Sequence, residues 1–156
     1  MMYCILNLFA DTNRVQEIAF SVGLSTNFSG GQGRIINFDK VFINHGAGFN
    51  TRTRKFTAML SGVYVFHFHA LSEIDKSEWI DLYHNFRYVN SLFGRVPTSY
   101  GAGSNSKSLE LLSGDEVYLS TRNQNTVIFG LPNQIYCTFS GYLLNPTFDN
   151  LPVIGK

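Results

Sequence analysis

Charged residues are scarce in this chain of 156 residues. Asp, Glu, Lys and Arg together make up 15% of the sequence, whereas an ordinary soluble domain carries about 25%. Twelve basic and eleven acidic residues leave a formal net charge of +1, so the global charge predicts neither nucleic-acid binding nor attraction to a membrane. A surface with so few charges predicts that part of it is covered by something other than water.

Long apolar runs and cysteines are also few. No run approaches the ~20 residues of a membrane-spanning helix, so we expect no membrane insertion. Two cysteines make no disulfide framework: Cys137 is expected to be a buried free thiol, and Cys4 is either incidental or forms an interchain bridge. The apolar segment 1–10 lacks a basic n-region and is either the stump of a secretory signal or a first strand. The glycosylation sequon 27–29 is compatible with secretion.

The sequence lacks catalytic signatures. It contains no Gly-x-Ser-x-Gly elbow, no P-loop, no His-Glu-x-x-His motif and no Cys/His cluster with metal-ligand spacing. The acidic pairs 73/75 and 115/116 lie in turn-rich segments, without the contrasting surroundings that separate a catalytic acid from a base. We therefore expect a binding protein and not an enzyme, with no cofactor and no bound metal.

Aromatic residues, in contrast, are abundant. The chain has 14 Phe, 8 Tyr and 1 Trp, and no segment shows a sustained 3.6-residue apolar period. Short aromatic and β-branched runs alternate with Gly-, Asn- and Ser-rich turns, which predicts an all-β sandwich or jelly roll. We expect one domain at 17–145, with tails at 1–16 and 146–156. Strands are predicted at 17–23, 34–38, 40–45, 54–59, 62–71, 79–83, 86–93, 107–112, 115–121, 126–130 and 135–144.

The predicted strand 62–71 carries unusual residues on both faces. Tyr64, Phe66 and Phe68 face one way, which is typical of a core. The opposite face consists of two valines and two histidines, without the charged residues of a solvated sheet surface. We infer that both faces are covered, the second by another subunit. The four residues of that second face are Val63, Val65, His67 and His69.

A spaced set of residues identifies the family that the chain resembles. The set is Phe38, Asn44, Phe49, Phe56, Gly62, Tyr64, Phe66 and Phe68. This pattern resembles the aromatic signature of the complement C1q globular-head family, and the similarity extends over about 19–144. The resemblance implies a ten-stranded jelly roll of two five-stranded antiparallel sheets, related to tumour-necrosis-factor-like cytokines. It also implies a secreted homotrimer, whose three-fold axis would bury the second face of strand 62–71.

The four histidines are expected to be structural. His67 and His69 would lie at the trimer axis, where protonation is expected to loosen the assembly by like-charge repulsion. His45 and His84 are predicted to lie exposed in turns.

Calcium binding is not expected in the segment where some family members hold it. The corresponding loop, 94–106, has no Asp or Glu, whereas calcium sites use six to eight oxygens that usually include carboxylates.

Charge is distributed unevenly along the chain. Segment 30–60 has five basic residues against one acidic residue, a net charge of +4, and segment 73–81 has four acidic residues against one lysine, a net charge of −3. Both are either solvated loops or parts of a ligand site. Guanidinium groups suit carboxylates and phosphates, and aromatic rings could stack on a sugar. The candidate ligand-binding residues are Arg52, Arg54, Lys55, Trp79, Tyr83, Arg87, Tyr100, Arg122 and Asn123.

The predicted function is pattern recognition. By family resemblance, the chain is expected to be a soluble trimeric lectin of innate immunity, which binds microbial surface glycans or other anionic carbohydrates through its loops. Three-fold display would multiply weak contacts, since linked sites raise avidity by ~10²–10⁴. A cytokine- or hormone-like trimer that binds a protein receptor is the alternative, and a structural or matrix trimer is a third.

Overall fold

The computed structural model describes residues 17–147, which form twelve β-strands and no helix. No segment of this range is therefore a helix that could cross a bilayer. The strands are β1 (Ala19–Gly23), β2 (Phe28–Gly30), β3 (Lys40–His45), β4 (Phe49–Asn50), β5 (Lys55–Thr57), β6 (Gly62–Leu71), β7 (Ser77–His84), β8 (Arg87–Arg95), β9 (Ala102–Leu111), β10 (Glu116–Thr121), β11 (Thr126–Ile128) and β12 (Thr138–Pro146).

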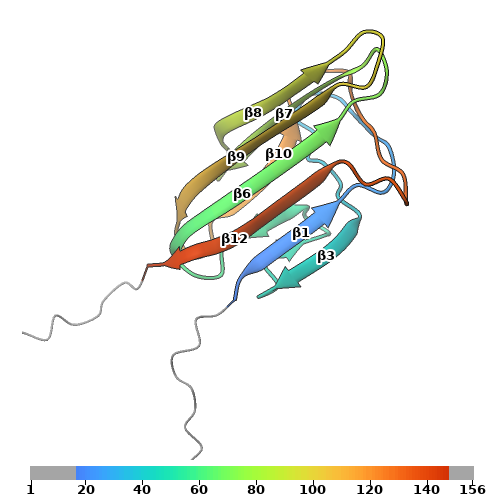
Figure 1. Ribbon diagram of the computed structural model, residues 1–156. Coiled ribbons are helices and arrows are strands. Elements are labelled where there is room, and N and C mark those ends of the chain that lie inside the picture. The colour runs from blue at the N-terminus through green and yellow to red at the C-terminus, as the bar shows by residue number, and fades with distance from the viewer. Residues whose placement is uncertain (1–16, 148–156) are drawn as a thin grey trace, which may run out of the picture.

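The strands form two stacked sheets. The five-stranded sheet has the order β3-β1-β12-β6-β9 and is seen face-on in Figure 1. The seven-stranded sheet has the order β2-β11-β7-β10-β5-β4, with β8 also paired to β7. Neighbours are antiparallel except at one parallel bridge between β11 and β7. The all-β jelly-roll prediction is confirmed, but the expected count of ten strands is wrong, because two short strands, β2 and β4, lengthen the second sheet.

Two predicted segments differ in the structure. Segment 34–38 is no strand: it pairs with β10 through a bridge from Ile35 to Ser120 and two backbone hydrogen bonds, from Ile36 N to Leu119 O and from Thr121 N to Arg34 O. The polar run from Ala102 onward, expected to be part of a loop, is instead the first half of β9. Its backbone pairs in continuous register with β6, so pairing with a long neighbouring strand overrides its turn-forming composition.

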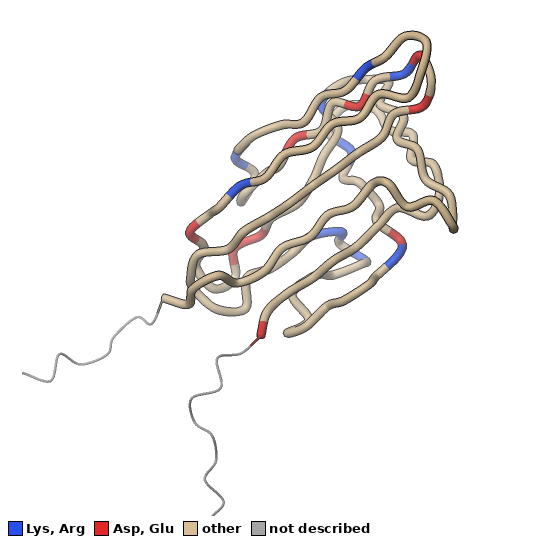
Figure 2. Tube along the Cα trace, in the orientation of Figure 1, with Lys and Arg blue, Asp and Glu red and all other residues tan. Residues whose placement is uncertain are grey.

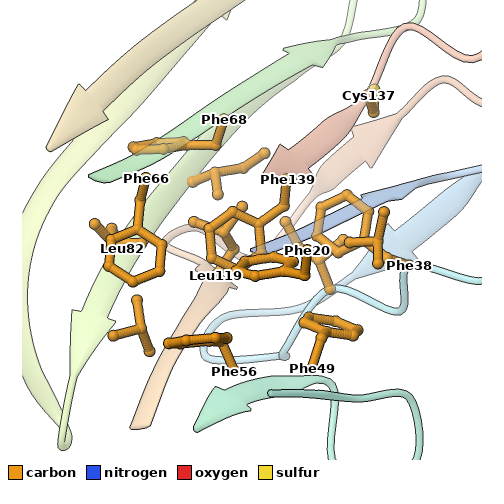
Figure 3. Packing of buried hydrophobic residues seen from close by; sticks show 14 of the residues in the cluster. Phe20, Phe38, Phe49, Phe56, Phe66, Phe68, Leu82, Leu119, Cys137 and Phe139 are labelled. Atoms are coloured by element: carbon orange, nitrogen blue, oxygen red, sulfur yellow. The ribbon is translucent and has the colours of Figure 1, made fainter. Parts of the chain in front are cut away.

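The aromatic signature forms the core between the sheets. Phe20 lies at its centre, with ring centroids 5.0 Å from Phe56 and 4.9 Å from Phe139, as Figure 3 shows. Gly141 leaves space for these rings, because a Cβ there would lie 2.6 Å from both Phe20 and Phe66. All six aromatic residues of the signature are buried. The predicted sandwich interior is therefore confirmed.

Asn44 has a separate part in the signature. Its side-chain amide donates to the carbonyl of Phe49 at 2.9 Å, and its Oδ1 accepts from the Phe49 backbone N–H at 3.0 Å. These two hydrogen bonds close the turn between β3 and β4. The spacing between Asn44 and Phe49 in the signature is therefore the spacing that this turn needs.

Two polar side chains are buried at one end of the core. Cys137 is 1% exposed, which confirms the predicted buried free thiol, and burial raises the pKa of this thiol to about 12. Cys4 lies outside the described residues. Glu78 is 0% exposed, and neither carboxylate oxygen has a hydrogen-bond partner within residues 17–147. Burial raises the pKa of Glu78 to about 7, with nearby Ser72 opposing the shift.

Candidate functional site

Strand β7 directs three polar or aromatic side chains to the outside of the seven-stranded sheet. Ile80 and Leu82 point into the core, so the alternate residues Trp79, Asp81 and Tyr83 share the outer face. Trp79 is 38% exposed, whereas Asp81 is 3% exposed. Asp81 and Glu78 are thus buried, so of the two alternatives for segment 73–81, the solvated loop does not hold for these two residues.

Arg122 connects the residues of this face. Its Nε donates to both carboxylate oxygens of Asp81, at 2.8 and 3.0 Å, and its Nη2 donates to Ser91 Oγ at 3.2 Å. The guanidinium carbon lies 5.2 Å from the ring centroid of Trp79 and 4.8 Å from that of Tyr88. The hydrogen bonds with Asp81 raise the pKa of Arg122 above its ordinary value. The guanidinium is therefore held rigidly between two aromatic rings.

A groove lies beside Arg122, and we call it the outer groove. Its volume is about 520 Å³, which lies within the ~300–1,000 Å³ typical of small-ligand sites. Strands β7, β8 and β10 and the turn before residue 34 supply its walls. The lining residues are Gln32, Gly33, Asp81, Tyr83, Tyr88, Thr121 and Arg122.

Part of this site was predicted from the sequence. Trp79, Tyr83 and Arg122 were candidates, and the structure brings these three to one face. Asp81 was missed because the acidic residues of 73–81 were counted together as one charged segment, and Tyr88 was not among the candidates. The alternation of Trp79, Asp81 and Tyr83 on one strand was the signal that could have placed Asp81 on the outer face.

Lys55 belongs to a second cluster on the same sheet. Its Nζ lies 2.8 Å from Glu116 Oε2, 4.9 Å from the ring centroid of Tyr118 and 5.0 Å from that of Phe86. Tyr83 stacks on Tyr118 with centroids 5.5 Å apart, which links the cluster to the outer groove. The charge of Lys55 is already paired with Glu116, so it is less available for an anionic ligand than the sequence suggested.

The other predicted ligand-binding residues are dispersed. Arg52 is exposed and Arg54 half-buried in the turn between β4 and β5, and Arg87 is exposed at the start of β8. Asn123 accepts a hydrogen bond from Thr126, and Tyr100 packs against Phe129 with centroids 5.4 Å apart. These positions show no single site that unites all nine residues.

The five-stranded sheet offers a different outer face. Its three central strands, β1, β12 and β6, contain no Lys, Arg, Asp or Glu, and Figure 2 shows β6 and β12 in tan along their length. The predicted interface residues Val63, Val65, His67 and His69 do lie together on this face. Exposed Tyr142 and Leu144 of β12 extend the apolar area, and Glu110 of β9 is its acidic edge.

The remaining histidines and the calcium segment lie elsewhere. His45 ends β3 and is exposed, but His84 ends β7 half-buried, with its Nε2 2.9 Å from Asp115 Oδ2, so its predicted exposure is wrong. Within residues 17–147, no group of three or more His, Cys, Asp or Glu side chains could hold a metal ion. The sequon residue Asn27 ties two loops: its amide donates to Glu73, and its Oδ1 accepts from Gly130 N.

Comparison with known proteins identifies relatives of this arrangement. A family model, described as the C1q domain, matches residues 19–144. Complement C1q tumor necrosis factor-related protein 3 of Homo sapiens is 38% identical over 137 residues, covering 84% of this chain and 52% of that protein. Complement C1q tumor necrosis factor-related protein 6 of Rattus norvegicus is 32% identical over 129 residues, covering 81% and 49%. The chain therefore spans about half the length of these curated relatives.

Solved structures share the fold. The globular domain of zebrafish complement 1qA superposes with a TM-score of 0.69 at 24% identity, covering 83% of this chain and 99% of that chain. The Eiger TNF of S. frugiperda superposes with a TM-score of 0.71 at 11% identity, covering 86% and 97%. These likenesses establish a jelly roll common to C1q and tumour-necrosis-factor domains.

Proposed function

Because the chain belongs to the C1q domain family, we propose that it acts as a secreted homotrimeric lectin that recognises surface glycans. It binds and does not catalyse. One observation supports this proposal most strongly: the two outer sheet faces differ. The face of β1, β12 and β6 contains no Asp, Glu, Lys or Arg and combines two valines and Tyr142 with two histidines, which suits burial against copies of the chain. The face of β7, β8 and β10 carries the outer groove and stays open to a ligand.

We expect the purified protein to bind a subset of glycans on a carbohydrate and microbial-polysaccharide array. Three copies of the outer groove would multiply a weak contact. Since segment 94–106 has no carboxylate, the signal should be the same with calcium and with a chelator. An array without signal in either condition contradicts the lectin proposal. Glycans bearing carboxylate or sulfate that lose their signal in the double variant Arg52→Ala/Arg54→Ala would indicate a second, cationic site in the β4–β5 turn.

We expect the trimer to weaken at acidic pH. His67 has Ser140 and Ser106 as cross-strand neighbours, and the one acidic residue of these strands, Glu110, lies opposite Val63, so no carboxylate lies directly opposite His67 to compensate its charge. Protonated imidazoles near a three-fold axis repel one another. Sedimentation velocity should show a lower trimer fraction at pH 5 than at pH 8. The double variant His67→Gln/His69→Gln should lose this difference, and a wild-type trimer unchanged at pH 5 would rule out the mechanism.

A receptor-binding trimer is the second candidate. The turn between β7 and β8 places two residues, Asn85 and Phe86, in the left-handed region, with φ of 46° and 67°. Phe86 is also 76% exposed, and a bulky residue held in this conformation costs roughly 1–2 kcal/mol. A strained, exposed aromatic residue fits a protein contact. Binding of the trimer to a cell-surface protein that Phe86→Ala abolishes, with no glycan binding, would favour this candidate.

A further inference from the structure

We propose that the outer groove holds one neutral hexopyranose ring. This inference rests on the lectin function proposed above and adds the site and the class of sugar. The groove joins an aromatic wall, a buried carboxylate and a carboxamide within about 520 Å³. That combination, apolar surface with a few fixed polar groups, is typical of small-ligand sites.

Tyr83 and Tyr88 form the aromatic wall. Their ring centroids are 6.4 Å apart at an interplanar angle of 75°, and Tyr88 is 53% exposed. A pyranose ring presents C–H groups on its faces, and this apolar surface packs favourably against an aromatic ring. Arg122 lies against Tyr88, and Ser91 Oγ lies 3.0 Å from the Tyr88 hydroxyl. The Tyr88 ring is therefore held in place before the ligand arrives, which lowers the entropy cost of binding.

The carboxylate and the carboxamide suit hydroxyl groups. Asp81 Oδ1 accepts hydrogen bonds from Ser91 and Arg122, whereas Oδ2 accepts one from Arg122. A carboxylate has about four lone-pair sites, so Oδ2 retains capacity for a sugar hydroxyl. Gln32 is exposed and lines the same groove, and its amide both donates and accepts.

The charge of the groove selects for a neutral sugar. Asp81 and Arg122 are the charged lining residues, and they neutralise each other in an ion pair in which Arg122 Nε donates to both carboxylate oxygens. A uronate or phosphate placed here would lose its hydration without gaining an unpaired cation, which is unfavourable. The groove therefore differs from the anionic carbohydrate site that the sequence suggested at Arg52, Arg54 and Lys55.

The single tryptophan provides a direct test. Trp79 is the one Trp of the chain and lies against Arg122, so its fluorescence should report occupancy. We expect saturable changes with methyl glycosides of glucose, mannose or galactose. Methyl glucuronide, which differs from the glucoside by its carboxylate, should bind at least about tenfold more weakly.

Three variants locate the binding site. Tyr88→Ala should lower the affinity at least about tenfold, because it removes the stacking surface. Tyr88→Phe keeps the ring and should stay within about threefold of the wild type. Tyr136→Ala removes a tyrosine of nearly the same exposure, 54% against 53%, that does not line the groove, and should bind as the wild type does. Since Tyr88 is exposed, circular dichroism and thermal melting should show all variants folded.

The outcomes separate this inference from the lectin function. Glycan binding on the array that Tyr88→Ala leaves unchanged would overturn the groove as the site, but not the function. Tighter binding of the glucuronide than of the glucoside would overturn the class of sugar. An array without any signal would overturn the lectin function and this inference together.

Discussion

Replacing Val65 with glutamate is expected to convert the proposed trimer to monomers. Val65 lies half-buried on the outer face of β6, between Tyr142 of β12 and Ser108 of β9. In a trimer built on this face, three carboxylates would lose water without a cationic partner, at several kcal/mol each. Sedimentation equilibrium should give the 17.6 kDa of one chain instead of three times that mass.

Val127→Glu is the matched control for this prediction. Val127 is also a half-buried valine in a strand, but it belongs to β11 of the opposite sheet, so this variant should remain trimeric. A trimeric Val65→Glu protein, or a monomeric wild type, would refute the assignment of this face. If the assignment holds, the monomer should keep its affinity for a single glycoside but lose ~10²–10⁴ in avidity for a polysaccharide surface.

Replacing Glu78 with glutamine is expected to stabilise the domain, with a gain that is absent at pH 4, grows as the pH rises above 4.5 and is complete at neutral and alkaline pH. Burial raises the pKa of Glu78 from its ordinary value of 4.5 to about 7, so the native state binds its proton more tightly than the unfolded state. The stability that this group contributes is complete below pH 4.5 and is lost as the pH rises through 7. Above that, ionisation destabilises the wild type by up to about 3 kcal/mol.

The measurement is the difference in unfolding free energy between Glu78→Gln and the wild type at several pH values. The gain should be about 3 kcal/mol at pH 8 and near zero at pH 4, measured at a fixed protein concentration because the stability of the proposed trimer would depend on it. Asp75→Asn removes an exposed carboxylate of the β6–β7 loop and should change little at any pH. An equal gain at pH 4 and pH 8 would mean that packing, and not ionisation, is responsible.

The fold was predictable where side-chain alternation and aromatic spacing coincide. Strand β6 was predicted to the residue, because Tyr64, Phe66 and Phe68 alternate with residues of a different kind. The short strands β2 and β4 were not predictable, since two or three residues show no period. The first half of β9 was missed for another reason: its Gly, Ser and Asn residues favour turns, and only pairing with β6 makes them a strand.

The candidate site was less predictable than the fold. Trp79 and Arg122 are 43 positions apart in the sequence, and their contact depends on the register of β7 and β10, which pairs Thr121 with Ile80. The local sequence also did not indicate the surroundings of the acidic residues. It suggested that Glu78 and Asp81 are exposed to solvent, whereas Glu78 is buried without a hydrogen-bond partner among the described residues and Asp81 is paired with Arg122. Such pairings arise from tertiary contacts and not from local pattern.

The antiparallel pairing of β1 with β12 places the start of β1 and the end of β12 at the same end of the domain. Ala19 lies opposite Tyr142, so residue 17 and residue 147 leave the sandwich at one pole (Figure 1). The β6–β7 and β8–β9 connections lie at the other pole. A linker fused before residue 17 or after residue 147 would therefore tether the domain by the same end. Immobilised in this way, three copies would present the β6–β7 and β8–β9 connections outward, with the outer groove on the flank, accessible from the side.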